Sequence, residues 1–295
     1  MMYHDNMDWN IFKKRPKIGL ALGGGGPKGL AHVGVISVLE RHNIPIDYIA
    51  GTSAGSIAGA FYAAKKNTTE IEKYILDKKW WEMLNLMMDP SFREGILQGK
   101  HFCCFLENFL GENLTFDHLK IPFTAVSVNL QNGRTMPLHK GSVVRAVLAS
   151  CAAPLLFKPV KIDEDYLIDG GLTNQVPVTI VKKMGADIVI AVNLTNKLTD
   201  SQIDEKMNFI DVSSRSIHIM LNTIASYQVR EADIVINPDL NWMHWRSLLS
   251  QEEKIKAIKK GEEAMEKQVL HLQEIILSKT PLIPLLVKKI KHFFT

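Results

Sequence analysis

The sequence has few cysteines and no long apolar run. Three of its 295 residues are cysteine, two of them adjacent at Cys103 and Cys104, and no CxxC spacing occurs. This usage excludes a disulfide framework and a cysteine-based metal site, and it is typical of a reducing compartment. The uninterrupted apolar runs are far shorter than the roughly 18–20 residues that span a bilayer, and the N-terminal residues lack the apolar stretch of a signal peptide. We therefore expect a cytoplasmic protein.

A strong excess of one charge is also lacking. The formal net charge is +4, and no basic run is interleaved with aromatic residues. This balance gives no support to nucleic-acid binding. Apolar residues make up 46% of the chain and charged residues 22%, which is ordinary for a globular protein with a sizeable core.

What the sequence does contain is a regular alternation of short apolar runs and helical stretches from residue 17 to residue 240. This alternation predicts an α/β fold of three layers, α/β/α, with a mostly parallel central sheet. We expect a polar arm at residues 1–16, the α/β domain at 17–240 and a helical extension at 241–295. The predicted strands cover residues 17–22, 46–50, 123–130, 134–138, 166–168, 187–194 and 234–237. The main predicted helices cover residues 28–42, 53–66, 142–150, 178–184, 205–231, 250–277 and 281–294.

A glycine-rich turn follows the first predicted strand, with the sequence Gly23-Gly24-Gly25-Gly26-Pro27-Lys28-Gly29. It matches a dinucleotide-binding fingerprint formally, but the acid at the expected distance, Asp47, begins its strand instead of ending it. A phosphate-binding P-loop is excluded because no Ser or Thr follows the lysine. Glycines turn backbone N–H groups toward a ligand without an obstructing Cβ. We therefore expect Gly25, Gly26 and Lys28 to donate to a negatively charged oxygen at a helix N-terminus.

A second glycine-framed turn, Gly51-Thr52-Ser53-Ala54-Gly55, follows the second predicted strand. Small residues around a serine suit a strained strand-to-helix turn that raises the hydroxyl as a nucleophile. Serine is also a preferred N-cap, so this motif alone leaves both roles open. The glycine-rich turn one strand earlier favours the nucleophile.

A serine nucleophile needs a base, and Asp169 is the best candidate. It stands at the end of a predicted strand, directly before Gly170 and Gly171. His218 and His244 follow it in the chain order of an α/β-hydrolase, but one lies inside a predicted long helix and the other in an aromatic stretch. His32 lies within the first helix, where we expect it to pack. The alternative for Asp169 is a plain Asp-Gly turn.

Together these motifs resemble the patatin-like phospholipases. The resemblance rests on the glycine loop with its basic residue, the GTSAG turn and the Asp169-Gly170-Gly171 motif, and it covers about residues 17–240. The segment from Ala149 to Val160 is also similar to the stretch that precedes the DGG motif in that family. Two departures are Pro27, where many members have a residue with an N–H, and Lys28, where many have arginine, which hydrogen-bonds differently.

The resemblance implies a patatin-like fold and a Ser–Asp dyad that works without histidine. It makes Ser53 the nucleophile, Asp169 the base, and the glycine loop with Gly24, Gly25, Gly26 and Lys28 the oxyanion site. Gly51, Gly55, Gly170 and Gly171 are then the motif glycines. No cofactor or metal is implied, and the partner is a lipid or another acyl ester.

A dyad of this kind poses a chemical problem. An ordinary aspartate, with a pKa of about 3.9, is a poor base for a hydroxyl. We expect Asp169 to be partly desolvated beside Ser53, and the oxyanion donors to supply much of the rate.

Two further segments are suited to lipid chemistry. The stretch Trp80–Leu110 is rich in Met and aromatic residues, so it belongs either to the core or, as we expect, to an apolar cap over an acyl pocket. Residues 275–295 contain no acidic side chain and mix lysines with aliphatic residues. They suit either a helix that contacts an anionic membrane peripherally or a terminal helix docked on the domain.

The leading interpretation is a serine acyl hydrolase of lipid esters. A non-catalytic lipid-binding or regulatory protein on the same fold is the alternative, and dinucleotide binding comes third. The oligomeric state, the head group and the chain length of the substrate stay open.

Overall fold

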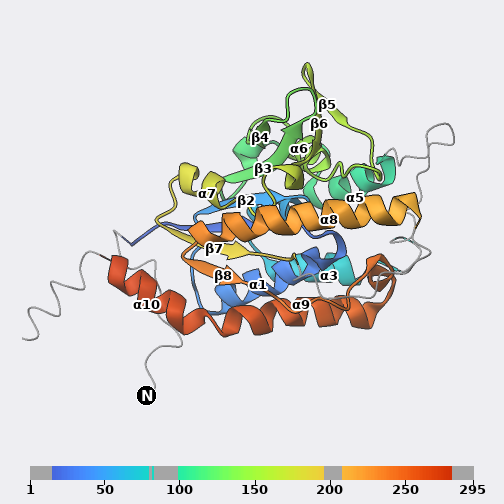
Figure 1. Ribbon diagram of the computed structural model, residues 1–295. Helices are drawn as coiled ribbons and strands as arrows, with labels where there is room; N and C mark the ends of the chain where they lie inside the picture. Colours follow the sequence, from blue (N-terminus) through green and yellow to red (C-terminus); the bar gives the residue numbers. More distant parts are fainter. Residues whose placement is uncertain (1–14, 80–81, 83–98, 196–207, 281–295) are drawn as a thin grey trace, which may run out of the picture.

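The computed structural model describes residues 15–79, 82, 99–195 and 208–280. Its centre is an eight-stranded sheet with the order β5-β6-β3-β2-β1-β7-β8, and β4 pairs with β3 beside this row (Figure 1). The strands are β1 (Ile18–Leu22), β2 (Tyr48–Thr52), β3 (Phe123–Asn129), β4 (Thr135–Leu138), β5 (Val160–Ile162), β6 (Asp165–Asp169), β7 (Ile188–Val192) and β8 (Ile234–Ile236).

The α/β class and the mostly parallel sheet are confirmed. The strands β3, β2, β1, β7 and β8 run parallel, while β4 and β6 run antiparallel to β3. One strand was not predicted: β5 forms a hairpin with β6, and Asp163 in the turn has a φ of 51°. The charged residues around this turn hide the apolar alternation that marks a strand.

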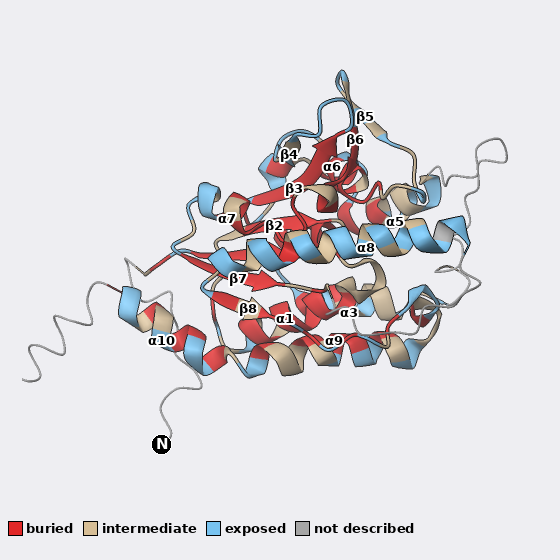
Figure 2. Ribbon diagram, in the orientation of Figure 1, coloured by how far each residue is buried: buried red, intermediate tan, exposed pale blue. Residues whose placement is uncertain are grey.

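The helices cover both faces of the sheet, and the strand residues alternate between them. Ile18, Leu20 and Leu22 of β1 belong to the large core on one face, while Ala21 belongs to a smaller core under α7 and α8 on the other. That second face is lined by small residues because α7 packs very closely: a Cβ on Gly19 would lie 2.0 Å from Val181 Cγ1. Figure 2 shows the buried sheet between the helices. The helices are α1 (Leu30–Arg41), α2 (Ala54–Lys65), α3 (Thr68–Leu76), α5 (Lys100–Leu110), α6 (Val143–Ser150), α7 (Val178–Met184), α8 (Phe209–Gln228), α9 (Gln251–Glu266) and α10 (Val269–Lys279).

The predicted C-terminal extension forms an outer layer on α1. Glycine allows the backbones of α1 and α9 to touch. A Cβ on Gly34 of α1 would lie 1.9 Å from the carbonyl oxygen of Ile258 in α9. The single helix predicted for residues 250–277 is two helices, α9 and α10. In α10, Lys279 donates to Asp233 Oδ1 at 2.9 Å, so this lysine of the basic tail binds the domain. Residues 281–295, the greater part of the segment 275–295 for which membrane contact and docking on the domain were both left open, lie outside the described residues.

The predicted cap segment is only partly described. Residues 80–81 and 83–98 lie outside the described residues. The remainder, α5, packs into the core: Leu106 is fully buried and Phe109 stacks on Phe61 of α2, with ring centroids 4.2 Å apart. For α5 the core alternative therefore holds, because its apolar side packs against α2 and α6.

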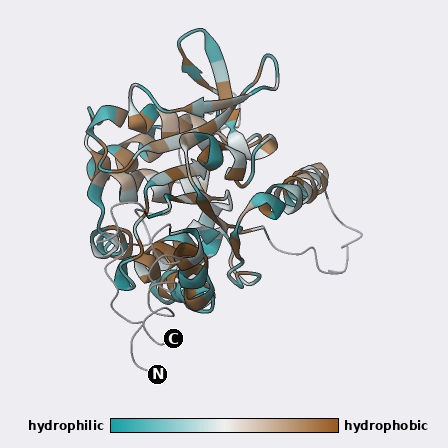
Figure 3. Cartoon of the chain, turned by 90° about the vertical axis from the view of Figure 1, so that its left-hand side faces the viewer, coloured by the Kyte–Doolittle hydropathy of each residue, from teal (hydrophilic) through white to brown (hydrophobic). Residues whose placement is uncertain are grey.

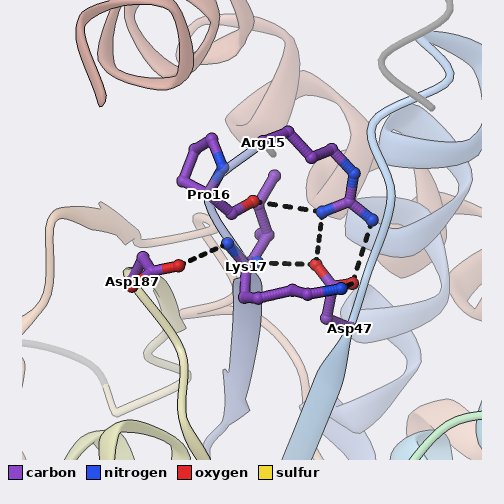
Figure 4. A network of polar contacts seen from close by, with 6 residues as sticks. Arg15, Pro16, Lys17, Asp47 and Asp187 are labelled. Atoms are coloured by element: carbon purple, nitrogen blue, oxygen red, sulfur yellow. Dashed lines mark hydrogen bonds and ion pairs between the residues drawn. The ribbon is translucent and has the colours of Figure 1, made fainter. Parts of the chain in front are cut away.

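The starts of three strands are joined by one polar network, shown in Figure 4. The Arg15 guanidinium donates to both carboxylate oxygens of Asp47, at 2.6 and 2.9 Å, and the Ile18 N–H donates to Asp47 Oδ2 at 2.8 Å. The Lys17 N–H donates to Asp187 Oδ2 at 2.7 Å. Arg15, expected in the polar arm, is therefore anchored to the domain, whereas residues 1–14 of that arm lie outside the described residues. Asp47 lies at the amino-terminal ends of the strands, the edge opposite the glycine loop, which argues against dinucleotide binding.

Asp47 is expected to contribute to stability in a pH-dependent way. Burial alone would raise the pKa of Asp47, but hydrogen bonds from Arg15, Ile18 and Lys17 and the charge of Arg15 hold it below its ordinary value of 3.8. A group with a lowered folded-state pKa stabilises the protein above its unfolded-state pKa, and this contribution is lost as the pH falls through the folded-state value. We predict that Asp47→Asn lowers the free energy of unfolding at neutral pH by about 2–3 kcal/mol, measured by urea denaturation.

Glu262→Gln is the matched control, because it removes a partner of the half-exposed Arg41 and should lower the free energy by less than about 1 kcal/mol. Equal losses in the two variants, or a deficit of Asp47→Asn that persists in strong acid, would contradict the account.

Candidate active site

The two glycine-framed turns lie side by side at the carboxyl edge of the parallel strands. The strands β1 and β2 are paired with Leu22 opposite Gly51, so the chain leaves both strands at the same level. The first turn leads through the short 3₁₀ helix η2 (Gly26–Gly29) into α1, and the second leads directly into α2. This is the edge at which open α/β sheets bind their ligands.

Ser53 occupies the strained position that the GTSAG motif predicts. Its φ of 51° and ψ of −122° lie in a region that non-glycine residues rarely adopt. It stands at the N-cap of α2, but its hydroxyl takes no hydrogen bond from the helix backbone. The plain capping role left open by the sequence is therefore wrong, and the hydroxyl is available for other contacts.

The positions on either side of Ser53 have no room for a side chain, so glycine is required at both. A Cβ on Gly51 would lie 2.3 Å from the Gly55 carbonyl oxygen, and one on Gly55 would lie 2.1 Å from the Leu22 carbonyl oxygen. Gly29 is similarly confined, since its Cβ would lie 2.6 Å from Ala54 Cβ. The two turns can therefore approach each other only with these small residues.

Asp169 reaches Ser53 from an antiparallel strand of the sheet. It ends β6, which is antiparallel to β3, and it pairs with Ser127. The preceding β3 residue, Val126, pairs with Thr52 at the end of β2. Ser53 follows Thr52 in the GTSAG turn, which we call the elbow. The antiparallel strand β6 therefore brings the Asp169 carboxylate beside the elbow.

The Asp169 side chain is buried between Gly171 and Ser53. The Gly171 N–H donates to Asp169 Oδ1 at 2.8 Å, and the Ser53 side chain lies close enough to act on the carboxylate. Burial raises the pKa of Asp169 to about 6, while the Gly171 N–H and the Ser53 hydroxyl act in the opposite direction. Gly170 and Gly171 are again sterically confined: a Cβ on Gly170 would lie 2.2 Å from the Val126 carbonyl oxygen.

Three consecutive residues at the end of α6 tie the elbow to Asp169, and their role was not predicted. The Ser53 N–H donates to Ser150 Oγ at 2.9 Å, and Ser150 Oγ donates to the Val126 carbonyl at 2.6 Å. The Ala152 carbonyl accepts the Asp169 N–H at 3.0 Å. Between them, the buried Cys151 lies 3.7 Å from Ser56 Oγ, measured from its Sγ. The sequence signal was present in the segment 149–160, but nothing local in it indicates these partners.

The glycine loop is held by Gln175, another residue that the sequence did not single out. The Gly24 N–H donates to the Gln175 carbonyl at 3.0 Å, and Gln175 Nε2 donates back to the Gly24 carbonyl at 2.9 Å. The Lys28 N–H donates to the Gly25 carbonyl at 3.3 Å. Of the predicted oxyanion donors, the amides of Gly24 and Lys28 are therefore engaged. The amides of Gly25 and Gly26 have no acceptor among the described residues.

The histidines take supporting positions. His32 is fully buried, and its Nε2 lies 2.8 Å from the Gly23 carbonyl oxygen at the start of the glycine loop. Burial lowers the pKa of His32 to about 4, so the ring is neutral at physiological pH. His244 caps η6 (Trp245–Leu249). His218 on α8 lies near Lys28: burial and the charges of Lys28 and Arg215 lower its pKa. The hydrogen bonds of His32 and His244 in the described part of the chain go to groups other than Ser53.

Comparison with known sequences identifies the family. A family model described as patatin-like phospholipase matches residues 20–182, which is more than half of the chain. The chain belongs to the patatin-like phospholipase family. The predicted family resemblance is thus confirmed.

Relatives extend this result. The chain is 32% identical over 194 residues to an uncharacterized NTE family protein of Mycobacterium tuberculosis, an alignment that covers 65% of this chain and 53% of that protein. It is 34% identical over 223 residues to lysophospholipase NTE1 of Candida albicans, covering 70% of this chain but 15% of that protein. The chain therefore spans about half of the mycobacterial relative and a small part of the fungal one.

A solved structure agrees in fold. VipD of Legionella pneumophila superposes with a TM-score of 0.50 at 15% sequence identity, covering 86% of this chain and 66% of that one. Among the described residues, no helix is long and apolar enough to cross a membrane. The same residues contain no group of three or more His, Cys, Asp or Glu side chains placed to hold a metal ion.

The buried Asp169 is expected to lower stability at neutral pH. Its folded-state pKa is raised above the unfolded value, so the group favours the folded state at low pH, and this advantage is lost as the pH rises through about 6. We predict that Asp169→Asn makes the protein more stable than the wild type well above pH 6, by about 1–3 kcal/mol, because a neutral amide can still accept the Gly171 N–H. Urea denaturation across the pH range measures this.

Low pH supplies the internal control for Asp169→Asn. Below the unfolded-state pKa both proteins carry a neutral side chain at this position, and their stabilities should converge. A variant less stable than the wild type at every pH would show that Asp169 is held for structural reasons.

Proposed function

We propose that this chain is a serine acyl hydrolase that cleaves fatty-acyl esters of lipids through Ser53 and Asp169. The observation that carries the proposal is the contact of a serine in a strained elbow with a buried carboxylate whose pKa is about 6. Membership of the patatin-like phospholipase family supports the same chemistry. A protein that only binds lipid has no need of a strained serine beside a buried carboxylate.

In the proposed reaction, Ser53 Oγ attacks the ester carbonyl carbon while its proton passes to the Asp169 carboxylate. The tetrahedral intermediate collapses, the bond to the leaving alcohol breaks, and Asp169 returns the proton to that oxygen. Water then attacks the acyl-enzyme with Asp169 again as the base. The second collapse breaks the bond to Ser53 Oγ, Asp169 returns the proton to that oxygen, and the fatty acid is released.

The raised pKa of Asp169 answers the objection that aspartate is too weak a base. A carboxylate with a pKa of about 6 is still mostly ionised at neutral pH, yet it accepts a proton more readily than one with an ordinary pKa. Burial is the physical cause of the raised pKa. The hydrogen bonds made by Ser150 and Ala152, at the end of α6, keep the carboxylate close to the elbow.

The amides of Gly25 and Gly26 are the proposed oxyanion donors, because neither has an acceptor among the described residues. Gly24 has a different part in this proposal: its two hydrogen bonds with Gln175 hold the loop in place. The partly buried Lys28 adds positive charge beside the loop. A preorganised donor of this type contributes about 2.7–4 kcal/mol to the transition state.

Lysophospholipids are the first substrates to test. The fungal relative carries the name lysophospholipase, and the present chain aligns with a limited part of it. A single-chain lipid also presents its ester more readily to a surface site than a lipid packed in a bilayer.

The first test of the function is the release of fatty acid from a panel of lysophospholipids, phospholipids and glycerides. We predict hydrolysis by the wild type and a loss of kcat of at least about a thousandfold in Ser53→Ala, since the nucleophile is removed. Fatty-acid release at the wild-type rate by pure Ser53→Ala protein would rule out the mechanism. Lipid binding without any hydrolysis would favour the non-catalytic alternative.

A second test concerns the hydrogen bond between Ser150 and the elbow. Ser150→Ala leaves the Ser53 N–H without its acceptor, so we predict a fall in kcat of about tenfold or more with little change in KM. Ser142→Ala is the matched control on the same helix: it removes the N-cap hydrogen bond to the Arg145 N–H and should lower stability by about 1 kcal/mol with kcat retained. Parallel losses of kcat in the two variants would mean that only helix stability matters.

A further inference from the structure

The helix α8 presents an unusual apolar stripe to solvent. Phe209, Val212, Ile219, Met220 and Tyr227 are exposed by 82%, 51%, 43%, 52% and 62%. Their spacing of three, seven, one and seven residues keeps them on one side of a helix. The stripe extends over about 27 Å along the helix. Figure 3 shows α8 as the single helix on the right, standing out from the rest of the chain.

The polar residues within the stripe turn their hydroxyl groups away from solvent. Ser216 Oγ donates to the Val212 carbonyl at 2.8 Å, and Thr223 Oγ1 donates to the Ile219 carbonyl at 3.0 Å. Serine and threonine that bond to the preceding turn present mainly carbon atoms outward. The stripe itself is therefore apolar, while the exposed surface of α8 beside it carries Asp211 and His218.

The inner side of α8 rests on the proposed active site. A Cβ on Gly171 would lie 3.2 Å from Leu221 Cδ2, so Leu221 covers the glycine beside Asp169. Gln228 accepts the Val176 N–H at 2.9 Å and donates to the Thr173 carbonyl at 3.1 Å. The helix is thus attached to the segment that directly follows the catalytic aspartate.

Two cations lie beside α8 near the glycine loop. The charges of Lys28 and Arg215 both lower the pKa of His218, which places Lys28 and Arg215 near this histidine. The exposed Asp211 precedes Arg215 by one helical turn. Trp245, with 48% of its surface exposed, lies against the loop as well: a Cβ on Gly26 would be 3.2 Å from its ring. Apolar groups facing outward, with cations beside them, form the arrangement of a helix that lies in the surface of a phospholipid layer.

We propose that α8 is the helix by which this chain docks on a phospholipid surface, with the stripe of Phe209, Val212, Ile219, Met220 and Tyr227 inserted among the lipids. Arg215 then meets the lipid phosphates, and the inner side of the helix stays over the active site. The inference rests on the proposed function for the choice of a lipid partner. It assigns lipid contact to a helix next to the site, separate from the C-terminal segment considered from the sequence.

The test is vesicle binding by the full chain carrying Ser53→Ala, so that binding is measured without hydrolysis. Vesicles of phosphatidylcholine and phosphatidylglycerol, mixed at about 3:1 to give a negative surface, are sedimented with the protein. We expect the parent to bind, and the added changes Val212→Ser, Ile219→Ser and Met220→Ser to weaken binding at least about tenfold, because apolar area is withdrawn from the lipid. Met220→Glu alone, a milder change to the helix, should weaken binding in the same direction.

Ile255→Ser with Leu270→Ser is the matched control, because these residues are exposed by 46% and 66% on α9 and α10. It should bind within about twofold of the parent, and thermal unfolding should show all variants folded, as is usual for exposed positions. The proposal is overturned if the parent does not bind vesicles, if the stripe variants bind as the parent does, or if light scattering shows a dimer that the stripe variants dissociate. If the Ser53→Ala variant still released fatty acid, the proposed function of Ser53 would be refuted. The vesicle-binding result would be unaffected.

Discussion

The closeness of the Ser53 side chain to the buried Asp169 carboxylate is the contact on which the rest of the site depends. It joins two strands that are not neighbours in the sheet, because β3 lies between β2 and β6. The surrounding structure serves to hold this contact: Ser150 accepts the elbow N–H, Ala152 accepts the Asp169 N–H, and Gly171 donates to the carboxylate. One short segment at the C-terminal end of α6 therefore positions both proposed catalytic groups.

This arrangement lowers the stability of the folded state. The Ser53 backbone lies in a conformation that costs of order 1–3 kcal/mol, and a carboxylate is kept in a buried position that raises its pKa. Both features persist because the large core on one face and the network at the opposite edge of the sheet stabilise the scaffold. Loss of stability at a functional site, offset elsewhere, is a common feature of enzymes.

Much of this could be predicted from local patterns. The apolar runs at 17–22 and 187–194 predict buried strands because parallel strands are covered on both faces, and the glycines at 51 and 55 predict a turn that only small residues can make. The antiparallel hairpin of β5 and β6 could not be predicted, because its turn at Asp163 lacks a typical hairpin dipeptide. Ser150 and Gln175 were missed for another reason: their partners lie 97 and 151 residues away in the chain. Contacts at such separations depend on the topology of the sheet and leave no periodic signal.

The central claim is that Ser53 is made nucleophilic by a buried carboxylate with a pKa of about 6. The most direct measurement is the rate at which a fluorophosphonate labels the protein as a function of pH, followed by mass spectrometry of the intact chain. The account predicts one adduct on Ser53, with a rate that rises about tenfold per pH unit below 6, levels off above it, and falls by orders of magnitude in Asp169→Asn. Labelling of Asp169→Asn at the wild-type rate, or a rate with no inflection near pH 6, would contradict it.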